Sequence, residues 1–157
     1  MPKFTIDQTD LRILQALQAD AGLSNVALAQ SVGLSPSPCL RRVRSLEASG
    51  VIRGRAAIID AAAVGLPVSV FLHVTLERQT EANLEAFEAA VTNAPEVMEC
   101  YLMTGDADYL LRVVAPDLDA FHRFLMDRLT NLPGVANIKS SFALKQVKYG
   151  YSLPIGV

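Results

Sequence analysis

The chain has 157 residues, of which 51% are hydrophobic and 19% charged, and this composition excludes a disordered or collagen-like protein. Its length suits one ordinary domain or two small ones. No apolar run approaches the ~20 residues that span a membrane, and the N-terminus lacks the pattern of a secretion signal, so we expect a cytoplasmic protein without a membrane partner. Cys39 and Cys100 lack the spacing of a disulfide or a metal site, and both are expected to be buried.

The formal net charge of -2 conceals an asymmetry between the two parts of the chain. Residues 1–55 contain seven basic and four acidic residues, whereas the remainder contains seven basic and twelve acidic residues. In the first part the basic residues gather in one short segment with Glu47 as its single acid: Arg41, Arg42, Arg44, Arg53 and Arg55. A local cluster of this kind is typical of a surface that meets a phosphate backbone.

The first part of the chain predicts three short helices. Asp7 and Ser24 are suited to cap the first two, and Ser35 is followed by a proline at the position where a helix tolerates the missing N–H. The third helix is expected to stop at Gly50, the residue type that adopts a left-handed cap. The side chains predicted to face the core are Leu11, Leu14 and Leu17 in the first helix and Cys39, Leu40, Val43 and Leu46 in the third.

The spacing of Ala29 and Gly33 indicates a helix-turn-helix, because a small residue lets two helices cross closely and a glycine permits the turn between them. The polar face of the third helix would then enter a DNA major groove, where arginine can read guanine. The alternative is a solvated helix with a basic face and no nucleic-acid partner. The predicted DNA-binding residues are Ser35, Ser37, Pro38, Arg41, Arg42, Arg44, Arg53 and Arg55.

The second part of the chain predicts a sheet with two helices. After an extended segment at 51–60 and a hinge at 61–65, apolar and polar residues alternate in the period of a strand. The predicted elements are a strand at 68–77, a helix from 80, strands at 97–103 and 109–114, a helix capped by Asp117, and a strand at 135–147. This order is the split βαβ arrangement, with both helices on one face of an antiparallel sheet. The predicted domains are residues 1–60 and 61–157.

The first strand of this sheet carries apolar residues on both of its faces, including Phe71 on the side that the helices leave uncovered. A second copy packed sheet to sheet would bury that surface. We therefore expect at least a homodimer.

Residues 34–43, which read LSPSPCLRRV, are followed by Leu46-Glu47 and by the run at 50–52, and together they resemble the DNA-binding signature of the Lrp/AsnC (leucine-responsive, or feast/famine) transcriptional regulators. The resemblance continues through residues 102–111 and 132–135. It implies an α+β chain with an N-terminal winged helix-turn-helix and a C-terminal ferredoxin-like sensing domain, assembled into tetramers or octamers. Arg55 departs from it, because the family commonly has an aromatic residue there.

The turn at 105–108, Gly-Asp-Ala-Asp, is by itself typical of a solvated hairpin, and a metal site or a catalytic pair is the other alternative. The resemblance implies that this turn lies between dimers and binds a small effector, usually an amino acid. Carboxylates can hold its ammonium group and backbone N–H groups its carboxylate. The effector-binding residues that it implies are Met103, Thr104, Gly105, Asp106, Asp108, Ser141 and Phe142.

The sequence therefore predicts a transcriptional regulator that binds double-stranded DNA and responds to an amino acid, with neither cofactor nor resident metal. An enzyme is not expected, because His73 and His122 lie far apart and no nucleophile or phosphate-binding motif is present. The alternative is an amino-acid-sensing regulatory module without DNA-binding activity.

Overall fold

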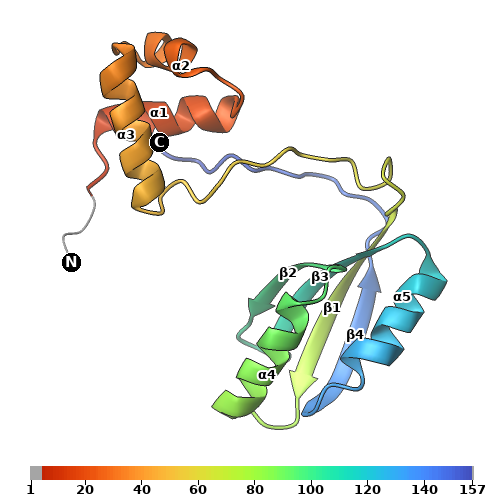
Figure 1. The fold of residues 1–157 in the computed structure, drawn as a ribbon. Helices are drawn as coiled ribbons and strands as arrows, with labels where there is room; N and C mark the ends of the chain where they lie inside the picture. Colours follow the sequence, from red (N-terminus) through yellow and green to blue (C-terminus); the bar gives the residue numbers. More distant parts are fainter. Residues whose placement is uncertain (1–4, 157) are drawn as a thin grey trace. The chain divides into compact units, whose positions relative to one another are not determined.

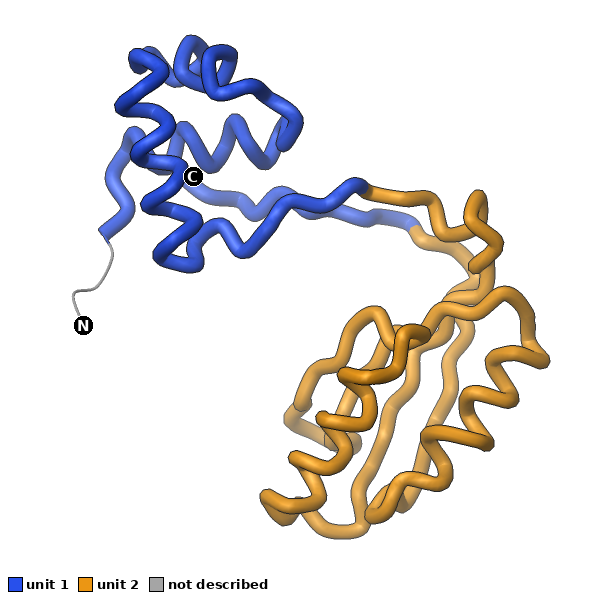
Figure 2. The backbone as a smooth tube through the Cα atoms, in the orientation of Figure 1, with its two compact units in different colours: residues 1–57, 147–157 blue, residues 58–146 orange. Residues whose placement is uncertain are grey.

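The computed structural model describes residues 5–156, which form two compact units (Figure 2). The helical unit comprises residues 1–57 together with the C-terminal segment 147–157, and the sheet unit comprises residues 58–146. The first boundary lies near the predicted one at residue 60. The sequence prediction placed the C-terminal segment in the second domain, whereas the structure groups it with residues 1–57.

The helical unit contains three helices, as predicted: α1 (Gln8–Ala19), α2 (Asn25–Val32) and α3 (Pro36–Ala48) (Figure 1). Its core is made of the buried residues Ile13, Leu28, Ala29, Val32, Cys39, Val43 and Leu46. The predicted face of α1 needs correction, because Ile13 is fully buried whereas Leu14 and Leu17 lie at the edge of the core. Leu40 on α3 is also 37% exposed rather than buried.

Short polar contacts set the ends of these helices. Asp7 and Asp10 form a capping box, in which each carboxylate accepts the other residue's backbone N–H. Ser24 accepts the N–H of Ala27 at the start of α2. Gly33 ends α2 with a φ of 71°, a left-handed conformation that glycine adopts without a steric penalty.

The sheet unit contains β1 (Val68–Leu76), α4 (Glu81–Thr92), β2 (Val97–Leu102), β3 (Tyr109–Ala115), α5 (Leu118–Phe124), the π-helical turn η1 (Leu125–Leu129) and β4 (Val135–Phe142). The strands pair antiparallel in the order β2-β3-β1-β4, and α4 and α5 cover one face (Figure 1). The predicted ferredoxin-like fold is confirmed. The last strand was predicted to continue to residue 147, and it ends at Phe142.

The core of the sheet unit lies between the sheet and its two helices. Val70, Leu72 and Val74 alternate along β1 and are fully buried, and Phe87 of α4 packs over them. The other face of the sheet is formed by the intervening residues and includes the ion pair between Arg112 and Glu99, with 2.8 Å between Nε and Oε1.

The two cysteines have different surroundings. Cys39 is fully buried, as predicted, but Cys100 is exposed near the edge of the sheet, and its expected burial was wrong. Cys100 lies on β2, an edge strand of the sheet. Its thiol is still partly desolvated, and this partial burial together with the nearby Glu88 carboxylate raises the pKa of Cys100 to about 11.

The C-terminal segment joins the helical unit through two glutamines of α1. The side chain of Gln18 accepts the N–H of Leu153 at 2.7 Å and donates to its carbonyl at 3.1 Å, as a neighbouring strand would. Gln15 donates to the carbonyl of Ile155 at 2.9 Å. These contacts explain why the segment groups with α1. Within residues 5–156, no helix is long and apolar enough to cross a membrane.

Candidate nucleic-acid interface and effector site

The helix pair α2 and α3 is held at a fixed crossing by small residues and backbone contacts. Ala29 of α2 is fully buried in the core of the helical unit, and its carbonyl accepts the N–H of Leu34 across the turn at 2.8 Å. The amide of Asn25 at the start of α2 donates to the carbonyl of Pro36 at the start of α3 at 2.8 Å. The turn between α2 and α3 therefore lies at Gly33, where the spacing of Ala29 and Gly33 predicted it.

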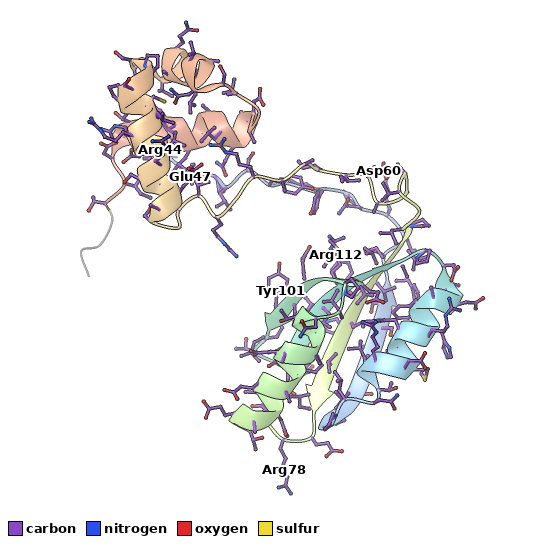
Figure 3. All side chains as sticks on the ribbon, in the orientation of Figure 1. Arg44, Glu47, Asp60, Arg78, Tyr101 and Arg112 are labelled. Atoms are coloured by element: carbon purple, nitrogen blue, oxygen red, sulfur yellow. The ribbon has the colours of Figure 1, made fainter. Side chains whose placement is uncertain are left out.

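Ser37, Arg41 and Arg44 are exposed and follow one another at spacings of four and three residues along α3. A rotation of about 100° per residue places all three on the side of α3 opposite the buried Cys39 and Val43. We call these three residues the outward face of α3. Arg44 is labelled on this helix in Figure 3.

The arginines of the predicted DNA site divide into two groups. Among residues 5–156, Arg41, Arg44 and Arg53 are exposed and make no ion pair, so their guanidinium groups are available to an anionic partner. Arg55 pairs with Glu47 at 3.2 Å, and Arg42 pairs with two carboxylates of the first helix. The structure thus brings all five arginines to one unit but leaves only some of them unpaired.

The remaining predicted DNA-binding residues lie where α3 begins. Ser35 is the exposed N-cap residue, and Pro38 is half-buried in the first turn. Pro36 and Pro38 have no backbone N–H, so among the first three residues of α3 only Ser37 can offer one to a phosphate.

The turn between β2 and β3 presents its tip to solvent. Residues 103–106 are exposed, and Gly105 has a φ of 121°, a conformation that a side chain would disfavour. The N–H of Met103 donates to the carbonyl of Asp108 at 2.8 Å and closes the turn. Asp106 therefore offers its carboxylate at the surface.

Asp108 is placed differently from Asp106. It is only 7% exposed, and its carboxylate accepts the N–H of Leu76 at 2.6 Å and the side-chain amide of Gln79. These bonds tie the start of β3 to the end of β1. The sequence analysis missed Gln79, since nothing in its own context indicated a contact with a residue so distant in the chain.

Ser141 and Phe142 are adjacent on β4, so their side chains lie on opposite faces of the sheet. Phe142 contacts Phe121 of α5 edge to face, with 5.4 Å between ring centroids. Phe142 is opposite Val70 on β1, whereas Tyr109, at the end of the turn, is opposite Val74. Four residues of strand span about 13 Å, so a single chain keeps the turn apart from Ser141 and Phe142.

Other groups that could carry chemistry have structural partners here. The hydroxyl of Tyr109 donates to Glu88 at 2.8 Å, and burial together with this bond raises its pKa. The residues that the structure describes contain no group of three or more histidine, cysteine, aspartate or glutamate side chains able to hold a metal ion.

Comparisons with known proteins agree with this arrangement. Residues 6–53 match the family model of a winged helix-turn-helix DNA-binding domain, and residues 69–153 match that of the Lrp/AsnC ligand binding domain. The Bkd operon transcriptional regulator of Pseudomonas aeruginosa is 51% identical over 150 residues, covering 96% of this chain and 98% of that protein. The leucine-responsive regulatory protein of Escherichia coli K12 is 40% identical over 154 residues, covering 98% and 94%.

A solved structure of a transcriptional regulator from Neisseria meningitidis in complex with L-Met superposes with a TM-score of 0.90 at 43% identity, covering 97% of this chain and 98% of that one. The AsnC family transcriptional regulator of Agrobacterium tumefaciens gives a TM-score of 0.87 at 40% identity, covering 94% and 96%. With a helix-turn-helix in one unit and a ligand-binding sheet domain in the other, the chain belongs to the Lrp/AsnC family of transcriptional regulators.

Proposed function

We propose that the outward face of α3 reads DNA in the major groove, and that an amino acid bound at the turn between β2 and β3 adjusts this binding. The observation that carries the first part is the exposure of Arg41 and Arg44 on one side of α3, opposite the side that packs in the core. Arg53 and the hydroxyl groups of Ser35 and Ser37 would contact DNA phosphates nearby, with Pro38 beside them, because an unpaired guanidinium group and hydroxyl groups donate to phosphate oxygens. The protein would act in the cytoplasm, with its DNA.

The effector site is proposed at residues 103–106. This turn has an exposed carboxylate for the ammonium group of an amino acid, and its glycine lets a ligand approach the backbone N–H groups. Asp106 would hold the ammonium group, and backbone N–H groups of the turn would hold the carboxylate. Ser141 and Phe142 lie too far along the sheet to join this site within one chain. They would complete it only from another copy, which supports a site shared between copies.

The assembly is proposed to be a dimer through the uncovered face of the sheet, with tetramers or octamers built from dimers. In a symmetric assembly two copies of α3 would address half-sites about 34 Å apart, or a multiple of this distance. An effector bound between copies would favour one assembly geometry and, by linkage, one affinity for DNA. The chain would thus act by binding and not by catalysis.

A thermal-shift screen of the common amino acids tests the effector site, with L-methionine first because the Neisseria meningitidis regulator was solved with it. We expect at least one amino acid to raise the melting temperature and Asp106→Ala to abolish that shift. Glu85→Ala, an exposed acid on α4, is the matched control and should keep it. The stabilising amino acid should also change the affinity for DNA from upstream of the protein's own gene. A screen in which none stabilises the chain would contradict this proposal.

A further inference from the structure

Two carboxylates from the start of α1 converge on one arginine of α3. Nη1 of Arg42 lies 2.8 Å from Oδ2 of Asp7 and 2.8 Å from Oδ1 of Asp10. The other oxygen of each carboxylate accepts a backbone N–H of the capping box. The same two side chains therefore cap α1 and hold Arg42, and Asp10 is buried while doing so.

The position of Arg42 around α3 separates it from the outward face. Two residues along a helix correspond to a rotation of about 200°, so Arg42 and Arg44 lie on nearly opposite sides. Arg42 also follows the buried Cys39 by three residues and precedes the buried Leu46 by four, which places it beside the core. Arg42 therefore lies on the side of α3 that faces away from Arg44.

The local charge also disfavours a phosphate at Arg42. Its single positive charge faces two carboxylates, so the cluster of Asp7, Asp10 and Arg42 carries a net charge of one negative unit when all three are ionised. A phosphate brought to this guanidinium would be repelled by both acids. The unpaired Arg41 and Arg44 meet no such competition.

We propose that Arg42 is a positioning residue: it acts through Asp7 and Asp10 to fix the recognition helix α3 on the start of α1, and it does not contact DNA. This inference rests on the proposed use of the outward face of α3. The bond from Asn25 to Pro36 holds the start of α3 against α2, and the Arg42 cluster holds its middle against α1. Together they set the direction in which Arg41 and Arg44 project.

The test compares Arg42→Gln, Asp10→Asn and the double variant, with Arg41→Gln as the control. Asn at position 10 retains an oxygen for the N–H of Asp7, so the cap of α1 is kept while the charge is removed. Binding to operator DNA is measured at several salt concentrations, at a temperature where circular dichroism shows each variant to be folded. We expect Arg42→Gln to weaken binding by about five- to tenfold, Asp10→Asn to weaken it by no more than this, and the double variant to bind no more weakly than Arg42→Gln, which already loses both carboxylate contacts.

The salt dependence separates positioning from phosphate contact. Arg42→Gln should leave the slope of log affinity against log salt unchanged, whereas Arg41→Gln should reduce it by about one if Arg41 meets a phosphate and weaken binding to the operator selectively if it reads a base. A reduced slope for Arg42→Gln, or tighter binding by Asp10→Asn, would overturn the proposal, since removing a nearby acid helps a phosphate contact. Unchanged affinity in folded Arg42→Gln would also overturn it, leaving only a role in stability.

A measurement without DNA keeps this inference distinct from the proposed function. The losses in melting temperature caused by Arg42→Gln and Asp10→Asn should not add in the double variant, because Arg42→Gln already removes the contact with Asp10 as well as the one with Asp7. Additive losses would contradict the pairing even if the chain binds DNA as proposed. Failure of the unmodified chain to bind any DNA would instead contradict the proposed function.

Discussion

Asp108 and Asp106 lie two residues apart in one turn, yet the structure gives them different surroundings. Asp108 is buried and accepts two hydrogen bonds, whereas Asp106 is exposed. We expect Asp108→Ala to destabilise the sheet unit by about 1–3 kcal/mol, because the N–H of Leu76 would lose its partner in a buried site. Asp106→Ala, the control, should change the free energy of unfolding by less than about 0.5 kcal/mol. Chemical denaturation measures both, and equal losses would contradict the assignment.

The capping carboxylate of Asp7 makes the helical unit sensitive to acid. The backbone N–H of Asp10, followed by the guanidinium of Arg42, holds the pKa of Asp7 below its ordinary value of 3.8. A carboxyl whose pKa is depressed by folding contributes stability that is complete above the ordinary pKa and is lost as the pH falls through the folded value. We expect helix loss to begin below about pH 4, and Asp7→Asn to flatten this dependence in circular dichroism. An acid transition unchanged by Asp7→Asn would contradict this.

At the scale of single residues, the sequence predicted which side chains cluster better than it predicted what each one contacts. Arg42 was predicted to be one of the DNA-binding residues, and its spacing from Cys39 and Leu46 places it beside the core of the helical unit. That spacing could have indicated a contact of Arg42 with another helix of the same unit. The contact of Asp108 with Leu76 was not predictable, because it depends on which strands pair.

Gly33 sets the turn between α2 and α3 through its backbone conformation. A Cβ at this position would meet no atom within 4 Å, but the φ of +71° is one that other residues rarely adopt. We expect Gly33→Ala to lower the free energy of unfolding by about 1–2 kcal/mol. Gly54→Ala is the control, because it also has open space and does not have a positive φ. Equal stabilities of the two variants in urea would contradict the role given to Gly33.

At the scale of elements, the helices and most strands could be predicted because their apolar residues repeat with the period of the element. The end of β4 could not. Apolar residues continue past residue 142, but Leu144 and Val147 are 99% and 88% exposed. The partner strand β1 begins at Val68, and the N–H of Ala143 donates to Ser69 as the last bond of this pairing. A strand ends where its partner does, and a local pattern carries no information on that.

At the scale of the whole molecule, the uncovered face of the sheet tests the proposed assembly. Phe71 lies half-buried on this face. If the chain forms the proposed dimer, Phe71→Glu should convert it into monomers in sedimentation velocity, because a charge would be buried between two sheets. Val26→Glu, at a 53% exposed apolar position on α2, is the matched control and should remain a dimer. A dimer that persists in Phe71→Glu would place the interface elsewhere.

The division of the chain into units was also only partly accessible from sequence. The change in composition near residue 55 indicated the first boundary. The return of the C-terminal segment to α1 depends on hydrogen bonds between Gln18 and the backbone of Leu153, 135 residues away. Every residue type has the same backbone carbonyl group, so no sequence pattern predicts that Gln18 bonds to the backbone of Leu153.

The most direct test of the account is the binding of Arg41→Ala/Arg44→Ala to operator DNA and to unrelated DNA, followed by fluorescence anisotropy at fixed salt. Removal of two base-reading side chains should cost about 1–3 kcal/mol each and bring operator affinity down to that for unrelated DNA. The effector-induced rise in melting temperature should remain, since the sheet unit is unchanged. Retention of the preference for operator DNA by this double variant would contradict the claim that the outward face of α3 reads the sequence.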